Sequence, residues 1–261
     1  MRTHIRLLLA AAALAAGGLL TGCKTGTLSG SRVPALYVGV TPDSPPIIFQ
    51  RNGAIAGIEA DLARALGKAL DRPIRFVELP WDQQIGALLA DRIDVIMSGM
   101  TITDERKVRI AFTEPYMLQG QSALVRRQDL DRFDTPQKIL AANANFAVQK
   151  KTTADMLVQQ VCRNASSVGW MNPDEGAQAL AARMIDIYIH DTPIIVWLAS
   201  ENEADLTAQP LPTPRQAIAW AVRKTDTDLL AAMNAALADW RKDGTLEQIV
   251  GLWLPPAAQA Q

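Results

Sequence analysis

Ile93–Arg106 reads I-D-V-I-M-S-G-M-T-I-T-D-E-R, and this stretch decides the fold. Its apolar, mostly β-branched start predicts a buried strand that ends at Ser98-Gly99, where glycine leaves the backbone accessible. Thr103 can cap a short helix, and Thr101 offers a further hydroxyl. Arg106 presents a rigid fork of donors that suits a carboxylate. The stretch therefore predicts half of a binding site for a small acid, or else a surface loop whose arginine pairs with neighbouring acids.

The bulk composition favours an ordinary globular protein. The chain has 261 residues, of which 49% are hydrophobic and 20% charged, with a net charge of −1. Such a length allows one large domain or two small ones with a packed core. The sequence contains no basic stripe interleaved with aromatic residues, so we expect no nucleic-acid partner.

The N-terminus has the pattern of an export signal. Residues 1–22 combine two arginines with a short apolar run rich in alanine and glycine, too short to predict a membrane span. Leu20-Thr21-Gly22-Cys23 resembles a bacterial lipobox, which implies cleavage before Cys23 and its lipidation with acyl chains such as palmitate. The alternative is a secretory signal cleaved nearby. Residues 23–34 then form a flexible tether.

The remaining cysteine and the histidines indicate neither a disulfide nor a metal site. Once Cys23 is lipidated, Cys162 has no partner, and we expect it to be a small buried residue on a helix. The two histidines, His4 and His190, form no cluster with cysteines, so we expect no zinc and no other cofactor.

Hydrophobic periodicity predicts alternating strands and helices, hence an α/β fold with mostly parallel sheets. Arg51-Asn52-Gly53 is typical of a hairpin turn, and Asp82 can cap the helix that follows it. We expect strands at 35–40, 74–79, 93–97, 122–125, 146–149, 185–189, 206–211 and 217–222, and helices at 59–70, 83–90, 136–142, 153–162, 173–183, 192–200, 228–242 and 245–253.

The chain contains a weak internal echo. Ala87–Gly99 and Ala179–Asp191 match when shifted by 92 positions, each with a helix end, an Ile-Asp pair, a strand and polar residues. Ligands of open α/β sheets bind beyond the carboxyl ends of the strands. We therefore expect Ser98-Gly99 and His190-Asp191 to face one shared cleft.

Taken together, these motifs resemble the bacterial extracellular solute-binding proteins of family 3, which deliver amino acids to ABC importers. The resemblance runs from about Ala35 to Trp253 and is most specific in the S-G-M-T-x-T-x-E-R block. The matching pieces, in order, are Val38–Pro46, Gly57–Leu66, Pro80–Leu88, Asp94–Arg106, Phe112–Tyr116, His190–Pro193, Trp220–Lys224 and Asp243–Ile249.

The resemblance implies a fold like that of type II periplasmic binding proteins, with two α/β lobes joined by two hinge strands and a ligand cleft between them. Lobe 1 would be discontinuous and contain residues 35–119 and 218–255. Residues 120–217 would form lobe 2 with the hinge strands, and residues 256–261 a tail. Closure of such lobes is an equilibrium biased by contacts made only in the closed form.

The resemblance also implies a role for each predicted site residue. Arg106 would bind the α-carboxylate of an amino acid, helped by Thr101 and by the helix start at Thr152 and Thr153. Asp191 would neutralise the α-ammonium group. The other implied contacts are Ser98, Gly99, whose carbonyl would accept from the ammonium group, and Trp81, as an aromatic wall. From the residues alone, Asp191, Thr152 and Thr153 could simply be helix caps, and Trp81 could belong to the core.

The sequence departs from the family pattern around the predicted site. Ser44 and Ile47 stand where the family usually has aromatic residues, and Lys150-Lys151 replace a glycine-containing helix start. A less aromatic and more cationic site favours a polar or acidic amino acid as ligand.

We therefore expect a monomeric, periplasmic, lipid-anchored binding protein without enzymatic activity, which works with an ABC permease in the inner membrane. One alternative is a periplasmic enzyme like the cyclohexadienyl or arogenate dehydratases. That branch has a glutamate three places beyond Asp191, where this chain has Ile194, which cannot transfer a proton. Another alternative is a sensory module for a membrane partner.

Overall fold

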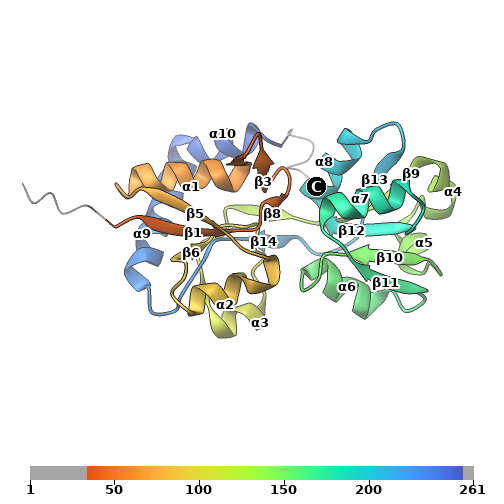
Figure 1. Ribbon diagram of the computed structural model, residues 1–261, viewed down its shortest axis with the longest axis horizontal. Coiled ribbons are helices and arrows are strands. Elements are labelled where there is room, and N and C mark those ends of the chain that lie inside the picture. Colours follow the sequence, from red (N-terminus) through yellow and green to blue (C-terminus); the bar gives the residue numbers. More distant parts are fainter. Residues whose placement is uncertain (1–33, 255–261) are drawn as a thin grey trace, which may run out of the picture. The chain divides into compact units, whose positions relative to one another are not determined.

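The structure, a computed structural model, describes residues 34–254, and its two five-stranded sheets lie in different halves of this part of the chain (Figure 1). The first sheet has the order β5-β1-β6-β15-β7. Its strands are β1 (Leu36–Val40), β5 (Ile74–Glu78), β6 (Val95–Ile96), β7 (Ala111–Phe112) and β15 (Ala221–Val222). The last strand comes from more than a hundred residues further along the chain, so the first half is discontinuous in sequence.

The second sheet has the order β11-β10-β12-β9-β13. Its strands are β9 (Gln121–Arg126), β10 (Asn145–Val148), β11 (Ser167–Trp170), β12 (Ile187–Asp191) and β13 (Leu206–Pro210). In both sheets the central strand, β6 or β12, is one of the two strands of the internal echo. Its carboxyl end carries the predicted site residues.

The remaining strands form two short antiparallel sheets. β8 (Met117–Gln119) pairs with β14 (Gln216–Ile218) where the chain passes between the halves. The other small sheet contains β2 (Asp43–Ser44), β3 (Ile48–Arg51) and β4 (Ala54–Ala56). As expected, β3 and β4 are joined by an Asn52-Gly53 turn, and both residues have the positive φ (53° and 75°) that this tight hairpin requires.

Helices cover the sheets and bury one apolar face each. On α1 (Ile58–Ala69), for example, Leu62 and Leu66 are fully buried. No helix within residues 34–254 is long and apolar enough to cross a membrane. The remaining helices are α2 (Gln84–Leu89), α3 (Asp104–Arg109), α4 (Leu130–Phe133), α5 (Pro136–Leu140), α6 (Thr153–Val161), α7 (Pro173–Ala181), α8 (Thr192–Glu201), α9 (Thr227–Asp243) and α10 (Thr245–Gly251), with short 3-10 turns at Trp81–Gln83 and Arg127–Asp129.

The structure differs from the sequence expectation in several places. The expected strand at 217–222 is two strands in different sheets, β14 and β15, because the chain crosses between the halves there. Half of the strand pairs in the two large sheets are antiparallel, because the strands next to these crossings run against their neighbours. Strand β11 was not expected, and Asp82 makes no capping hydrogen bond to α2. Cys162 is buried, as expected, at the end of α6.

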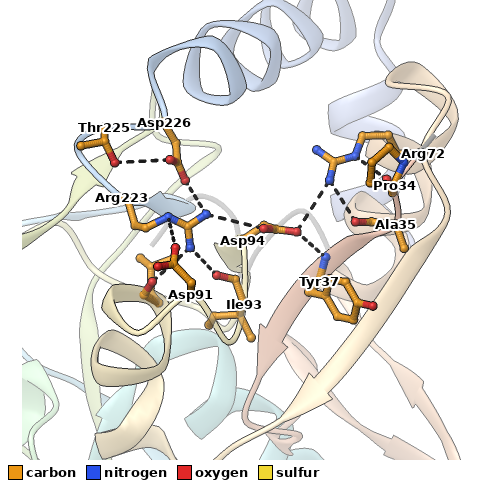
Figure 2. Close-up of polar contacts among 11 residues, drawn as sticks. Pro34, Ala35, Tyr37, Arg72, Asp91, Ile93, Asp94, Arg223, Thr225 and Asp226 are labelled. Atoms are coloured by element: carbon orange, nitrogen blue, oxygen red, sulfur yellow. Dashed lines mark hydrogen bonds and ion pairs between the residues drawn. The ribbon is translucent and has the colours of Figure 1, made fainter.

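A charge network supports the central strand of the first sheet (Figure 2). The Arg223 guanidinium donates to the carbonyls of Leu88 (3.1 Å) and Ile93 (2.7 Å), which lie just before β6. It also forms ion pairs with three aspartates, including Asp94 at 3.5 Å. Asp94 in turn accepts a hydrogen bond from the backbone N–H of Tyr37, at 2.9 Å. This arginine therefore ties the loop before β6 to the neighbouring strand β1.

The second sheet has a matching network around Arg126. Its guanidinium donates to the carbonyls of Leu180 and Ile185 and pairs with Asp186 at 2.9 Å and with Asp129. Asp186 accepts from the backbone N–H of Asn145 at 3.0 Å, the counterpart of the contact between Asp94 and Tyr37. Because the Arg126 side chain is only 7% exposed, its charge depends on these partners.

We expect Arg126→Ala to lower the free energy of unfolding by about 3–5 kcal/mol, because it removes a buried cation and leaves two half-buried carboxylates and two backbone carbonyls without their partner. Urea denaturation of the purified protein would measure this loss. The control Lys107→Ala removes an exposed ion pair with Asp104 and should cause no measurable loss. Equal stability of both variants would contradict a supporting role for the network.

Candidate functional site

A single cavity is lined by all eight residues for which the sequence predicts ligand contact. It contains about 460 Å³ of empty space, open solvent at its mouth included. The eight residues come from both halves of the chain: Trp81, Ser98, Gly99, Thr101, Arg106, Thr152, Thr153 and Asp191. Their roles toward a ligand remain predictions.

The start of helix α3 positions the Arg106 side chain in the cavity. Thr103 caps the helix by accepting the backbone N–H of Arg106, at 3.2 Å. The guanidinium donates to the carbonyls of Thr101 (2.8 Å) and Lys151 (3.1 Å) and lies 5.3 Å from the Trp81 ring centroid. These hydrogen bonds use two of the five N–H groups of the guanidinium, so three remain for a bound anion.

Asp191 places a carboxylate at the end of β12, on the other half of the chain. It is 8% exposed, and burial raises its pKa above the usual value, against the opposing effects of His190, the nearby Gln119 amide and Arg106. Burial lowers the pKa of Arg106, and the negative charges of Asp191 and Glu105 oppose this decrease. Asp191 occupies the cap position of α8 but makes no side-chain capping bond, so capping alone does not explain this residue.

The loop after β6 brings backbone groups to the cavity. Gly99 has a φ of 71°, and a Cβ there would lie 3.0 Å from the Ile47 side chain, so the position favours glycine. The Ser98 hydroxyl accepts the backbone N–H of Thr41 at 2.8 Å, which fixes the end of β1 against this loop.

A buried acid lies behind this loop. Glu59 is fully buried, and its Oε1 accepts a 2.6 Å hydrogen bond from the Tyr116 hydroxyl. Burial raises the pKa of Glu59 to about 8, while Tyr116 and the backbone of Gly99 lower it. Glu59 therefore connects helix α1 to Tyr116 by a buried hydrogen bond.

The start of α6 faces the same cavity. Thr152 caps the helix by accepting the N–H of Asp155 at 3.3 Å, so its side chain is engaged in capping, the alternative that the sequence left open. The Thr153 hydroxyl accepts from the Gln121 amide at 2.9 Å. The helix start can therefore offer an anion its first backbone N–H groups and its positive dipole end, but not these two hydroxyl groups.

Sequence reasoning missed several polar residues that line the cavity. Gln119 precedes the first crossing between the halves, and Gln149 follows β10. Gln119 is 3% exposed, and neither of its amide atoms has a hydrogen-bond partner among the described residues. Gln149 could have been found from its place at the carboxyl end of a strand. The remaining lining residues not predicted as contacts are Thr41, Ser44, Ile47, Met117, His190, Ile194 and Ile218.

The two lysines do not make the cavity cationic. The Lys150 ammonium lies 4.1 Å from the centroid of the exposed Trp170 ring. The Lys151 ammonium pairs with Asp82 at 3.5 Å. Neither residue lines the cavity, so the physical reason for expecting an acidic ligand does not hold.

Several contacts join the two halves around the cavity. The Lys151 carbonyl accepts from Arg106 and, at 3.2 Å, from the Trp81 indole. Elsewhere, the ring centroids of Phe49 and Trp197 lie 5.7 Å apart. In this structure, direct contacts between the two halves therefore close the cavity.

A family model described as bacterial extracellular solute-binding proteins, family 3, matches residues 36–256. Among curated proteins, the L-cystine-binding protein TcyJ of Escherichia coli (strain K12) is 28% identical over 219 residues, which cover 84% of this chain and 82% of that protein.

Solved structures of similar proteins share the fold. An ancestral amino-acid-binding protein described as a precursor of cyclohexadienyl dehydratase matches with a TM-score of 0.78 and 31% identity, covering 84% of this chain and 95% of that one. An ancestral arginine-binding protein bound to arginine matches with a TM-score of 0.80 and 29% identity, covering 85% and 99% of the two chains.

The raised pKa of Glu59 predicts how the stability of the folded protein depends on pH. The ordinary pKa of a glutamate, 4.5, applies in the unfolded chain, whereas burial raises the pKa of Glu59 to about 8 in the folded protein. Between these values the folded state retains a proton that the unfolded state has released. Stability should therefore fall as the pH rises through this window, by at most about 5 kcal/mol. Glu59→Gln should remove this decline in urea denaturation at a series of pH values.

The exposed Glu203→Gln serves as the control and should retain the wild-type pH profile. If the wild type and Glu59→Gln lose stability in parallel over this window, the decline comes from other groups.

Proposed function

Because this chain belongs to family 3 of the bacterial extracellular solute-binding proteins, we propose that it is the amino-acid-binding component of an ABC importer. It would capture a free amino acid in the periplasm and deliver it to a permease in the inner membrane. The observation that carries this proposal is that a buried cation, Arg106, and a buried anion, Asp191, line one cavity from opposite halves of the chain.

This pair of charges suits a zwitterion. The three remaining N–H groups of Arg106 would bind the α-carboxylate, with support from Thr101 and from the start of α6 at Thr152 and Thr153. Because the guanidinium is already fixed by backbone carbonyls, it loses little conformational freedom when it binds.

The α-ammonium group of the ligand would bind next to the anion of the charge pair, Asp191. Asp191 would neutralise it, and the Gly99 carbonyl and the Ser98 hydroxyl would complete its hydrogen bonds. The Trp81 indole, already close to Arg106, would form a wall over the ligand. The attraction between these buried charges and the zwitterion would then offset the cost of removing them from water.

Binding would bias the equilibrium between open and closed forms. The paired strands β8 and β14 form the connection between the halves, and we propose that the crossings near residues 120 and 217 act as the hinge between lobes 35–119 plus 218–255 and 120–217. A ligand that contacts both halves is bound fully only when they close, so it stabilises the closed form.

The cavity favours binding over catalysis. Ile194, at the place where the dehydratase branch has its acid, is 2% exposed and lines the cavity with an apolar side chain. Such a side chain cannot move a proton. We therefore propose that the protein has no enzymatic activity, and an assay for phenylpyruvate formation from prephenate or arogenate should show none.

We propose that the protein is held at a membrane surface by lipid on Cys23, which lies outside the described residues. The basis is the Leu20–Cys23 lipobox at the end of an export signal. The acyl chains would anchor the chain without a membrane-spanning helix. Anchoring would keep the binding protein near the permease, and a neighbouring gene pair for a permease and an ATPase would favour transport over sensing.

We expect Arg106→Ala and Asp191→Ala each to weaken amino-acid binding by more than about 30-fold, since losing one partner of a buried charge contact costs about 2–5 kcal/mol. Isothermal titration calorimetry with the soluble form from Lys24 onward would measure it, using ligands that raise the melting temperature in an amino-acid screen.

Arg109→Ala removes an exposed arginine from the same helix α3 and should leave the affinity within about twofold. If either cavity variant binds as tightly as the Arg109 control, the role assigned to that side chain is wrong.

We expect Cys23→Ala to shift the protein from the membrane fraction to the soluble fraction of cells, because lipid attachment requires the thiol. Cys162→Ala should leave the protein in the membrane fraction, since that thiol is buried. Mass spectrometry of the wild-type N-terminus would identify the acyl groups. An unmodified mature N-terminus would rule the anchor out.

A further inference from the structure

Asp43 carries a partly buried carboxylate that lies next to the cavity but does not itself line it. Asp43 lies in β2, and its oxygens accept from the Ser44 hydroxyl (2.7 Å) and the Gln149 amide (3.1 Å). Both of these neutral donors line the cavity. Asp43 forms no ion pair with any residue in the part of the chain that the structure describes, and burial raises its pKa. A carboxylate so placed gains stability from a cation.

His190 does not supply that cation. Its Nδ1 accepts the backbone N–H of Asp191 at 2.8 Å, so this nitrogen carries no proton. Its Nε2 lies 3.1 Å from the Gln149 Oε1, an acceptor, and therefore carries the single proton of a neutral ring. Burial also lowers the pKa of His190. The hydrogen bonds from His190 through Gln149 to Asp43 thus contain one negative charge and no positive one.

The cations around the cavity in residues 34–254 have other partners. Among the residues that line the cavity, Arg106 is the one fixed cation, and its partner for a zwitterion is Asp191. Lys150 and Lys151 hold their ammonium groups against Trp170 and Asp82. A bound zwitterion adds no net charge, so it would satisfy Arg106 and Asp191 and leave the Asp43 charge unbalanced.

The two carboxylates act on different parts of the site. The groups that shift the pKa of Asp191 include Arg106 and Gln119, whereas those that shift the pKa of Asp43 include Ser44 and Asp174. His190 affects both. Asp43 is linked to the cavity through Ser44 and Gln149, so a ligand side chain that reached these two lining residues would come close to its carboxylate.

We propose that the ligand is a basic amino acid whose terminal ammonium or guanidinium group pairs with Asp43, oriented by Ser44 and Gln149. This inference rests on the proposed function, because it assumes that Arg106 and Asp191 hold the α-carboxylate and α-ammonium groups. An acidic side chain would instead bring a second negative charge to a carboxylate that already lacks a counterion, which disfavours binding.

Asp43 also contacts both halves when the cavity is closed, because Gln149 comes from the second half and Asp43 from the first. A cation at this place would contact a carboxylate on one half while its ammonium or guanidinium donors reach the Gln149 carbonyl oxygen on the other. Selection of the side chain and closure of the halves would then depend on the same contacts.

Titration calorimetry of the soluble form with L-arginine, L-lysine, L-glutamine and L-glutamate would test the proposal. For the wild type, we expect arginine or lysine to bind at least tenfold more tightly than glutamine, and glutamate most weakly. Asp43→Asn keeps the size and one acceptor of the side chain but removes the charge. It should weaken the basic ligands by tenfold or more and glutamine by less than threefold.

Asp174→Asn is the matched control, since it removes an exposed carboxylate near Asp43 that, unlike Asp43, forms no hydrogen bond with a cavity-lining side chain of the described residues. It should change each affinity by less than about threefold. Tightest binding of glutamine or glutamate, or equal effects of the two asparagine variants on the basic ligands, would overturn this inference but leave amino-acid binding intact. Binding of none of these amino acids, and no thermal shift with any other, would overturn the proposed function itself.

Discussion

A buried guanidinium that must stay charged is the constraint on which the site depends. Arg106 loses most of its contact with water and is compensated by the Thr101 and Lys151 carbonyls and by the Trp81 ring. The protein thus maintains a cation in a low-dielectric cavity, where its attraction for an anion is much stronger than in water. The local sequence positions this cation, because the Thr103 cap determines where helix α3 starts and hence where Arg106 points.

The same scaffold supports both halves of the site. Arg223 and Arg126 bind the carbonyls of residue pairs that lie 92 positions apart in the sequence, Leu88 and Ile93 in one half and Leu180 and Ile185 in the other. Each network fixes the entrance to a central strand whose far end carries Gly99 or Asp191. The internal echo, weak as a sequence pattern, therefore corresponds to an equivalent set of hydrogen bonds in three dimensions.

Local pattern was enough to predict most elements and the shared cavity, because strand ends, caps and the Asn52-Gly53 turn are encoded by neighbouring residues. It failed where tertiary contacts decide. The expected strand at 217–222 is split by its passage between halves, and the ammonium groups of Lys150 and Lys151 are directed away by Trp170 and Asp82. Gln119 gains its importance from burial without a hydrogen-bond partner, and Asp43 from having no ion-pair partner among the described residues, neither of which a sequence records.

The contact between Phe49 and Trp197 has a consequence for how such a protein can evolve. These rings hold the halves together away from the cavity, so they stabilise the shut conformation whether or not it is occupied. Apparent affinity equals intrinsic affinity scaled by the fraction of molecules already competent to bind. Substitutions in these rings would strengthen or weaken capture of every solute by a common factor, which allows adaptation to scarce or abundant nutrients without altering which nutrient is chosen.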